Sequence, residues 1–346
     1  MHDGDSIQSA IDDLDRKFLD LLSQRSELTQ QLADANPQST VGRVVAAAQH
    51  IDSLAPDTDA AELLRHVSSI CLKNISSVRV AFLGPLHSYS HLASVKYFGD
   101  AVEFAPVASI PAVFEAVADE HATMGIVPIE NSTDGRIVDT LGMFVRQKMH
   151  ICGEVLLPVH HNLLSRTPLA EITEVHSKPQ ALSQCREWLA KHLPAATIHE
   201  ISSTTAAAKL ASEKHGVAAV ASIQAGREYS LDVIHASIED NPNNVTRFAV
   251  LGRDDVPPSG NDKTSLLFQI DHAPGALADV MNVFKQHALN LTWIESFPAP
   301  NSPNEYLFFV ELSGHQQEAN VAKAIDVLAS STERLEILGS YAKAAL

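Results

Sequence analysis

Cysteine and positive charge are scarce in this chain of 346 residues, and long apolar runs are missing. The three cysteines are widely spaced and odd in number, so they form neither a zinc-binding pattern nor a disulfide framework. No apolar run approaches the roughly 18 residues of a membrane-spanning helix. The acidic start lacks the basic and apolar regions of a secretory signal. We therefore expect a cytoplasmic protein that does not act in a membrane.

The shortage of positive charge also restricts the partners. Lysine and arginine total 25 against 42 acidic residues, which gives a formal net charge of −17. Such a field repels nucleic acid and anionic membrane surfaces, so we expect neither as a partner. An anionic ligand would need local groups to bind it. Hydrophobic residues make up 45% of the chain, enough for substantial cores, and the length predicts two or three domains.

Apolar residues recur at helical spacing in the first part of the chain. Residues 6–35 carry isoleucine, leucine and phenylalanine at steps of three, four and seven, which predicts one long amphipathic helix. Pro37 disfavours helix at the residue before it. Two shorter helical patterns follow at about 41–54 and 59–76. Three such helices cannot bury their apolar faces alone, so we expect a bundle that a second chain completes.

From residue 78 onward, short apolar runs alternate with helical stretches. This alternation predicts an α/β domain with a mostly parallel sheet. The expected strands lie at about 78–83, 124–130, 150–159, 172–177, 216–222 and 247–252, and the expected helices at about 110–120, 179–193 and 204–213.

The stretch 253–263 has the composition of a linker. After it the pattern is strand, helix, strand, strand, helix, strand, which is the order of a ferredoxin-like α+β domain. We therefore expect a multidomain chain. It would have an all-α bundle over 1–76, an α/β domain over 78–255 and an α+β domain over 263–346.

A hydroxyl, a guanidinium and an aromatic ring stand side by side where the last α/β strand begins. Thr246, Arg247 and Phe248 follow the polar loop 239–244. On their own they fit an ordinary strand, which starts with polar residues and whose phenylalanine begins the core. Motifs elsewhere in the middle segment favour a different interpretation.

Four motifs, taken in order, resemble those of the prephenate dehydratase family. Each motif is weak alone, whereas the set of four is specific. They are GPLHSYSHLASVKYFG at 84–99, GIVPIENSTDG at 125–135, HSKPQALSQCR at 176–186 and IEDNPNNVTRF at 238–248.

The flanking segments have resemblances of their own. The last segment resembles an ACT domain, through PGALADV at 274–280, NLTWIESFP at 290–298 and LGSY at 338–341. The first segment resembles, more loosely, an all-helical chorismate mutase domain. The whole layout is similar to that of the bifunctional mutase–dehydratase enzymes.

The resemblance implies two α/β lobes, similar to periplasmic ligand-binding proteins, with the ligand between them. The first lobe would use about 78–157 and 247–252, and the second about 160–230. The implied substrate, prephenate, carries two carboxylates and loses water and carbon dioxide to give phenylpyruvate. Aromatisation drives the reaction, so we expect no cofactor and no metal. The ring hydroxyl leaves poorly unless a placed hydroxyl or acid donates to it.

The same resemblance assigns roles to residues of this chain. Thr246 would be the catalytic residue and donate a hydrogen bond or proton to the departing hydroxyl. Arg247 would pair with a substrate carboxylate through its planar fork, and Phe248 would wall the pocket or pack in the core. The other implied substrate-binding residues are Ser88, Tyr89, Ser90, Asn131, Ser132, Ser177, Gln180, Gln184 and Thr204.

Some of these residues have a plainer alternative. Ser88 and Thr204 stand where an ordinary helix N-cap would stand, although a helix N-terminus also binds carboxylates well. Asn131 follows the carboxyl end of a strand, where the ligand sites of α/β sheets gather. Lys178 replaces a family histidine and either adds a cation near the ligand or points to solvent. His87 replaces a family glycine and can alter the turn.

In the last domain the resemblance implies phenylalanine binding at a dimer interface, with feedback inhibition. The alternative is a dimerisation module without a ligand. Phe297 stands where the family has arginine. The implied ligand-binding residues are Gly275, Ala276, Leu277, Asn290, Leu291, Glu295 and Ser296.

In the first domain only Arg25 matches an arginine of the mutase family. Gln8, Asn36 and Ala46 stand at or near positions where that family has charged residues. One arginine is too little to hold a dianion through a compact transition state. We therefore expect a degenerate domain that serves dimerisation, in a homodimer or homotetramer, with mutase activity lost.

Two other functions stay open at this point. One is arogenate dehydratase, whose substrate has an amino acid side arm instead of the pyruvyl ketone. The other is a non-catalytic ligand sensor, because the two-lobed fold also serves pure binding. Retention of Thr246, Arg247 and Phe248 argues against the sensor.

Overall fold

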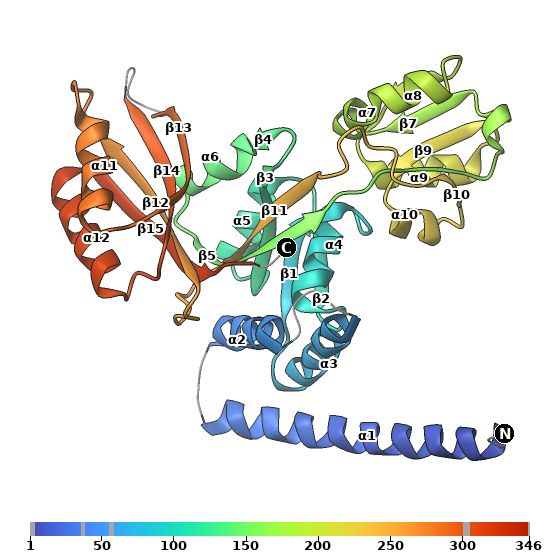
Figure 1. Ribbon diagram of the computed structural model, residues 1–346, viewed down its shortest axis with the longest axis horizontal. Helices are drawn as coiled ribbons and strands as arrows, with labels where there is room; N and C mark the ends of the chain where they lie inside the picture. Colours follow the sequence, from blue (N-terminus) through green and yellow to red (C-terminus); the bar gives the residue numbers. More distant parts are fainter. Residues whose placement is uncertain (1–3, 36–38, 55–58, 300–304, 345–346) are drawn as a thin grey trace.

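The computed structural model describes residues 4–35, 39–54, 59–299 and 305–344. Three N-terminal helices are followed by two α/β lobes and a C-terminal sheet with two helices. The first lobe lies in the centre, between the second lobe and the C-terminal domain (Figure 1). Within the described part of the chain, no helix is long and apolar enough to cross a membrane. Pro37 lies outside the described residues.

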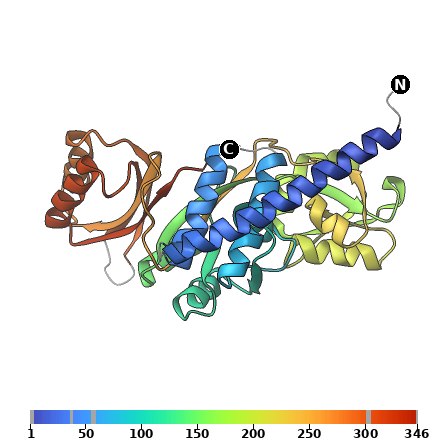
Figure 2. The ribbon, with the colours of Figure 1, turned by 90° about the horizontal axis from the view of Figure 1, so that it is seen from below.

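The N-terminal helices lie where the apolar periodicity predicted them. They are α1 Gly4–Ala35, α2 Thr40–Leu54 and α3 Asp59–Ile75. Valines of α2 join the core of the first lobe. The long helix α1 instead lies outside the lobes, across α2 and α3 (Figures 1 and 2). Its apolar residues, such as Ile11 and Phe18, are exposed, so its cover by a second chain stays a prediction.

The first lobe contains a six-stranded sheet in the order β2-β1-β3-β11-β5, with β4 paired to β3. β1 forms a continuous apolar run because both of its faces are covered, and Val80, Ala81 and Phe82 are fully buried. The strands are β1 Arg79–Leu83, β2 Glu103–Val107, β3 Met124–Asn131, β4 Gly135–Arg136, β5 His150–Pro158 and β11 Val245–Gly252, and the helices are α4 Tyr89–Phe98, α5 Ile110–Ala118 and α6 Val138–Arg146.

The second lobe contains a five-stranded sheet in the order β10-β6-β9-β7-β8. Its central strand β9 is small and apolar because helices pack on both faces. Ala218 and Val220 contact the α7–α8 side, whereas Ala219 and Ala221 contact the α9–α10 side. The elements are β6 Asn162–Ser165, the 3-10 helix η1 Leu169–Glu171, β7 Glu174–Ser177, α7 Pro179–Gln184, α8 Arg186–His192, β8 Thr197–Glu200, α9 Thr204–Glu213, β9 Val217–Ala221, α10 Ile223–Glu228 and β10 Asp232–His235.

The expectation of mostly parallel sheets was wrong. β1 is parallel to β2 and β3, and β7 to β8 and β9. β11, however, is antiparallel to both of its neighbours, and β6 is antiparallel to β9 and β10. The reason is the chain path, since the chain leaves the first lobe after β5 and returns to it as β11. This return places Thr246 in the middle of the first sheet.

The C-terminal domain has the strand order β13-β14-β12-β15, which is the predicted ferredoxin-like order. One face of its sheet packs on α11 and α12, through residues such as Phe268 and Val310. The other face packs on the first lobe, and Phe309 and Tyr341 belong to the core of that lobe. The elements are β12 Asp262–Ile270, α11 Ala276–Gln286, β13 Leu291–Pro298, β14 Tyr306–Ser313, α12 Ala319–Ser331 and β15 Arg334–Ala342.

Candidate active site

A cleft of about 520 Å³ lies between the two lobes. Its lining comes from β11, from the N-terminal ends of several helices and from the segments that connect the lobes. Phe248 both lines the cleft and packs in the core, so the two interpretations of this ring hold together. The cleft brings together these predicted residues: Ser88, Tyr89, Ser90, Asn131, Gln180, Gln184, Thr204, Thr246 and Phe248.

Three predicted substrate-binding residues lie elsewhere, and these predictions are corrected. Ser177 is fully buried and donates its hydroxyl to the carbonyl of Val220. Ser132 accepts from the backbone N–H of Val245, outside the cleft lining. Arg247 points to the opposite face of β11 from Thr246, because side chains alternate along a strand. Its guanidinium binds protein carboxylates instead of facing the cleft.

The hydroxyl of Thr246 is oriented by Asn131, its register partner on β3. Oδ1 of Asn131 accepts from the backbone N–H groups of Thr133 and Asp134, at 2.9 and 3.1 Å. This pattern sets the orientation of the amide, so that Nδ2 donates to Oγ1 of Thr246 at 2.8 Å. Because that oxygen is the acceptor, the hydroxyl hydrogen of Thr246 is left to donate into the cleft.

Further hydrogen bonds link Asn131 to the second lobe. Nδ2 of Asn131 also donates to Oδ1 of Asn244, at 2.8 Å. Asn244 then donates to Oε1 of Gln184 on α7, at 3.0 Å. Gln180 and Gln184 both donate to the carboxylate of Asp134, at 2.5 and 2.8 Å. The two glutamines therefore connect the lobes across the cleft, where we expected substrate contacts.

His161 extends this network to Tyr89. Oε1 of Gln184 can only accept, so Nε2 of His161 donates to it at 2.9 Å. The hydroxyl of Tyr89 donates to the carbonyl of His160 at 2.7 Å, and its oxygen lies 3.1 Å from Nδ1 of His161. Burial lowers the pKa of His161, and the hydrogen bond with Gln184 only partly opposes this. The neutral form of the ring is thus favoured.

Several helix N-termini meet at the cleft. Ser88, Ser109 and Ser203 cap α4, α5 and α9, and each accepts from a backbone N–H in the first turn. All three line the cleft, as does Lys178. Helix N-termini carry partial positive charge and bind carboxylates. The cleft therefore offers local groups for an anion, although the chain is acidic overall. Thr204 is the first residue of α9 and not its cap.

Sequence reasoning missed the capping residues Ser109 and Ser203 and three members of the hydrogen-bond network. His161 and Asn244 lie in the two segments that connect the lobes, and Asp134 follows β3. A signal was present for each of them, because Asp134 and Asn244 belong to the quoted motifs and His161 follows a predicted strand. His87 adopts the left-handed region with a φ of +64°, as a glycine would. The turn before α4 is therefore kept despite the side chain.

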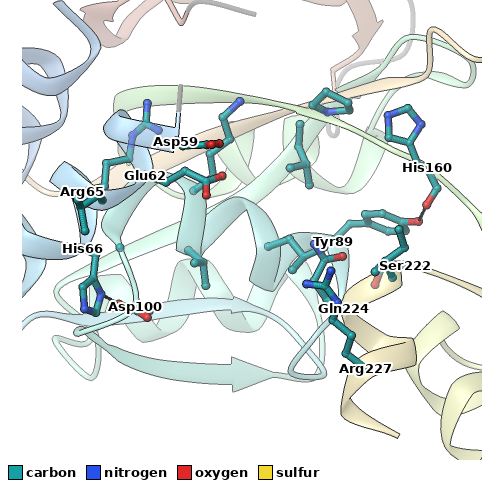
Figure 3. Close-up of a pocket in the computed structure, with 18 of the residues that line it drawn as sticks. Asp59, Glu62, Arg65, His66, Tyr89, Asp100, His160, Ser222, Gln224 and Arg227 are labelled. Atoms are coloured by element: carbon teal, nitrogen blue, oxygen red, sulfur yellow. Dashed lines mark hydrogen bonds and ion pairs between the residues drawn. The ribbon is translucent and has the colours of Figure 1, made fainter. Parts of the chain in front are cut away.

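A second cavity, of about 820 Å³, lies on the other side of the segment that connects β5 to β6 (Figure 3). Neighbouring residues of this segment face opposite ways. Val159 and His161 line the cleft, whereas Pro158 and His160 line the second cavity. Of the predicted site residues that the structure describes, only Tyr89 lines it. The larger cavity thus lacks Thr246 and the other predicted substrate-binding residues apart from Tyr89, and the cleft is the candidate active site.

One group among the described residues could hold a metal ion. It consists of Glu174 and His176 on β7 and His199 on β8, whose ligand atoms lie within 4.8 Å of one another. None of the three lines the cleft. The cleft itself presents hydroxyls, amides and helix N-termini.

The residues predicted to bind phenylalanine lie around the start of α11 and on β13. Gly275 precedes α11 in the left-handed conformation, with a φ of +88°. Glu295 forms an ion pair with Arg136 of the first lobe at 2.6 Å, and Phe297 packs against the core of that lobe. Ala276 and Leu277 are the first residues of α11, Asn290 and Leu291 lie where β13 begins, and Ser296 is exposed on β13.

Arg25, the residue matched to the mutase family, lies partly buried on α1. Its Nη1 atom is buried and has no hydrogen-bond partner among the described residues. Gln8 is exposed and donates to Asp12 on the same helix. Asn36 lies outside the described residues.

Comparisons with known proteins point in one direction. The sequence model of the prephenate dehydratase family matches residues 80–256. A bifunctional chorismate mutase/prephenate dehydratase from Pseudomonas aeruginosa is 36% identical over 358 residues, which cover 99% of this chain and 98% of that protein. The structure of a prephenate dehydratase from Arthrobacter aurescens in complex with L-Phe has a TM-score of 0.72 and 31% identity, over 77% of this chain and 90% of that one.

Another solved structure is described as a novel type of quorum quenching acylase. It has a TM-score of 0.70 and 29% identity, over 77% of this chain and 98% of that one. The family model and the full-length relative confirm the assignment that the four motifs predicted. The chain belongs to the prephenate dehydratase family and is a prephenate dehydratase with an N-terminal chorismate mutase-like region.

Proposed function

We propose that prephenate binds in the cleft with its departing hydroxyl beside Thr246. The N-terminal ends of α4, α5 and α9 and the cation of Lys178 bind the substrate carboxylates. Phe248 forms an apolar wall for the ring. Closure of the lobes, which Gln180 and Gln184 already bridge through Asp134, excludes water and strengthens these interactions.

The reaction moves one electron pair through the ring. The bond to the ring carboxylate breaks, carbon dioxide leaves, and the pair completes the aromatic ring. The ring hydroxyl leaves at the opposite end and takes up a proton to become water. Thr246 donates towards this hydroxyl, and the N–H of Asn131 stabilises the charge that develops on Oγ1 of Thr246. Arg247 takes no part in binding, because its guanidinium lies on the other face of the strand.

The observation that carries this role is the orientation of the Thr246 hydroxyl by Asn131. Thr246→Ala should lower kcat by about 10²–10⁴-fold, the usual effect of a placed proton donor. Thr246→Ser should keep most of the activity, because it keeps the hydroxyl. The assay follows phenylpyruvate absorbance in alkali after incubation with prephenate. Wild-type turnover by the alanine variant would exclude the role.

The same assay addresses the alternatives. Comparing kcat/KM for prephenate and arogenate measures the substrate preference, which depends on the group beside the second carboxylate. Absence of product from the wild-type protein with either substrate would favour a ligand sensor.

The C-terminal domain acts as an ACT domain that binds phenylalanine and inhibits the enzyme. Its ferredoxin-like order and the left-handed turn at Gly275 support this role, since backbone N–H groups at the start of α11 can donate to a carboxylate. The Arthrobacter relative is described in complex with L-Phe. Equilibrium dialysis with phenylalanine tests it, and Gly275→Ala should weaken binding because alanine disfavours a φ of +88°.

The N-terminal region serves dimerisation and has lost mutase activity. A second copy would cover the exposed apolar face of α1, which includes Leu14, Leu21 and Leu28. Light scattering of the purified protein measures the oligomeric state. Conversion of chorismate to prephenate, at a rate that Arg25→Ala abolishes, would overturn the loss of activity.

A further inference from the structure

The side chain of Arg247 lies in a buried cluster of carboxylates. Nε lies 3.0 Å from Glu130, and Nη1 lies 2.6 Å from Glu311 and 3.3 Å from Glu154. The guanidinium also stacks on the ring of Trp293, 4.7 Å from its centroid. Arg247 is 8% exposed and Glu154 and Glu311 are buried, so their contacts are shielded from water, whereas Glu130 is partly exposed.

The partners of Arg247 come from two domains. Glu130 and Glu154 lie on β3 and β5, the strands on either side of β11 in the first lobe. Glu311 and Trp293 lie on β14 and β13 of the C-terminal domain. One arginine on the strand of Thr246 thus binds the first lobe and the C-terminal domain at the same time.

The cluster depends on its cations. Burial works to lower the pKa of Arg247, but Glu311, Tyr341 and Glu154 outweigh it and raise that pKa above its ordinary value. Lys263 on β12 binds the same carboxylates, at 2.7 Å from Glu154 and 3.6 Å from Glu311. Removal of either cation leaves buried carboxylates with less compensation, which is destabilising.

A second contact joins the C-terminal domain to β4, which pairs with the strand of Asn131. Arg136 on β4 forms an ion pair with Glu295 on β13. β4 pairs with the end of β3, where Arg136 is opposite Glu130 and Gly135 is opposite Asn131. β14 therefore contacts β11, the strand of Thr246, directly, and β13 contacts β3, the strand of Asn131, through β4.

We propose that Arg247 is a positioning residue through which the C-terminal domain controls the place of Thr246 in the cleft. Thr246 and Arg247 are neighbours on one strand, so a shift of Glu311 relative to the first lobe moves the strand that carries Thr246. A displacement of about 1 Å is enough to cost roughly 10²-fold in rate. The link between phenylalanine and the dehydratase rate through Arg247 rests on the proposed function of the C-terminal domain.

The test uses the full chain and three variants. Glu311→Gln cuts the charge link from the side of the C-terminal domain. It should leave phenylalanine binding, measured by equilibrium dialysis, within about threefold of wild type. Inhibition should nevertheless weaken, so that activity at saturating phenylalanine rises at least about tenfold. Normal phenylalanine binding with weakened inhibition would show that Glu311 transmits the effect of phenylalanine to the active site. A purely structural role of Glu311 would not produce this combination.

Arg247→Lys, on β11 of the first lobe, and Lys263→Met, on β12 of the C-terminal domain, are a matched pair, because both cations bind Glu154 and Glu311. Lysine lacks the planar fork of arginine and cannot reproduce its contacts, so Arg247→Lys should lower kcat about 10²-fold with little change in KM. Lys263→Met removes a cation from the same carboxylates without touching β11. It should lower the melting temperature while kcat and maximal inhibition stay at wild-type values.

Two results would overturn the inference. The first is normal inhibition of Glu311→Gln despite normal phenylalanine binding. The second is equal kcat for Arg247→Lys and Lys263→Met. If the wild-type protein binds no phenylalanine, the proposed regulation fails, and the comparison of kcat alone decides the positioning role. If Arg247→Lys does not fold, Glu311→Gln still decides it.

Discussion

Replacement of Asn131 by aspartate would reverse the hydroxyl of Thr246. The carboxylate has the shape of the amide and can still accept from the N–H groups of Thr133 and Asp134, which keeps the turn after β3. The atom that now donates to Thr246 becomes an acceptor. Thr246 would then donate its hydrogen to the aspartate and withdraw it from the cleft.

The size of the effect follows from the contacts. Loss of a placed proton donor lowers the rate by about 10²–10⁴-fold, or roughly 3–5 kcal/mol in the barrier. Oδ1 of Asn244 is buried and also loses its donor, which costs about 1–3 kcal/mol of stability. We therefore expect Asn131→Asp to fold with a lowered melting temperature and to lose most of its kcat, with a smaller change in KM.

The assay is phenylpyruvate formation, together with thermal unfolding. Ser132→Ala is the control, because Ser132 belongs to the same turn and bonds Asn243 and Val245 outside the cleft lining. It should lose stability but keep kcat. If Asn131→Asp keeps kcat within threefold of wild type while Thr246→Ala loses it, the orientation of the hydroxyl by Asn131 is refuted.

Three further predictions concern the scaffold. Burial, then the charge of His87, lowers the pKa of His91 to about 4. As the pH falls, His91 is protonated in the unfolded chain before it is protonated in the folded one. Its contribution to the free energy of unfolding is therefore present above about pH 6.5 and lost as the pH falls towards 4. The free energy of unfolding of His91→Gln, measured in urea, should therefore depend less on pH in this window than that of the wild type. Equal dependence on pH in the two proteins would contradict the lowered pKa of His91. At Gly125 an added Cβ would lie 2.8 Å from a methyl group of Val113 in the core, so Gly125→Ala should lower the free energy of unfolding by about 1–3 kcal/mol in urea titration. At Gly339, whose φ is +143°, an added Cβ would lie 2.2 Å from the carbonyl oxygen of Ile151. Gly339→Ala should loosen β15 from β5 and speed proteolysis in the linker 253–261; unchanged cleavage would show that this contact does not hold the domain.

Local patterns were enough for much of the fold. The three N-terminal helices and the C-terminal strand order follow from periodicity, because one apolar face per element is a property of neighbouring residues. Strands β2, β8 and β10 were missed because they lie at sheet edges. At an edge, polar residues and proline interrupt the apolar run. β6 was missed because it is only four residues long.

By itself the sequence determined the family and the residues that can do the chemistry, since Thr246, Asn131 and the helix-capping serines belong to motifs of contiguous residues. Only the tertiary structure decided which way their side chains face. The return of the chain as an antiparallel β11 puts Thr246 on the cleft and Arg247 against Glu311 of another domain. Neighbouring residues of a strand point to opposite faces of its sheet. Which of the two faces meets the substrate depends on which elements of the chain pack against the opposite face.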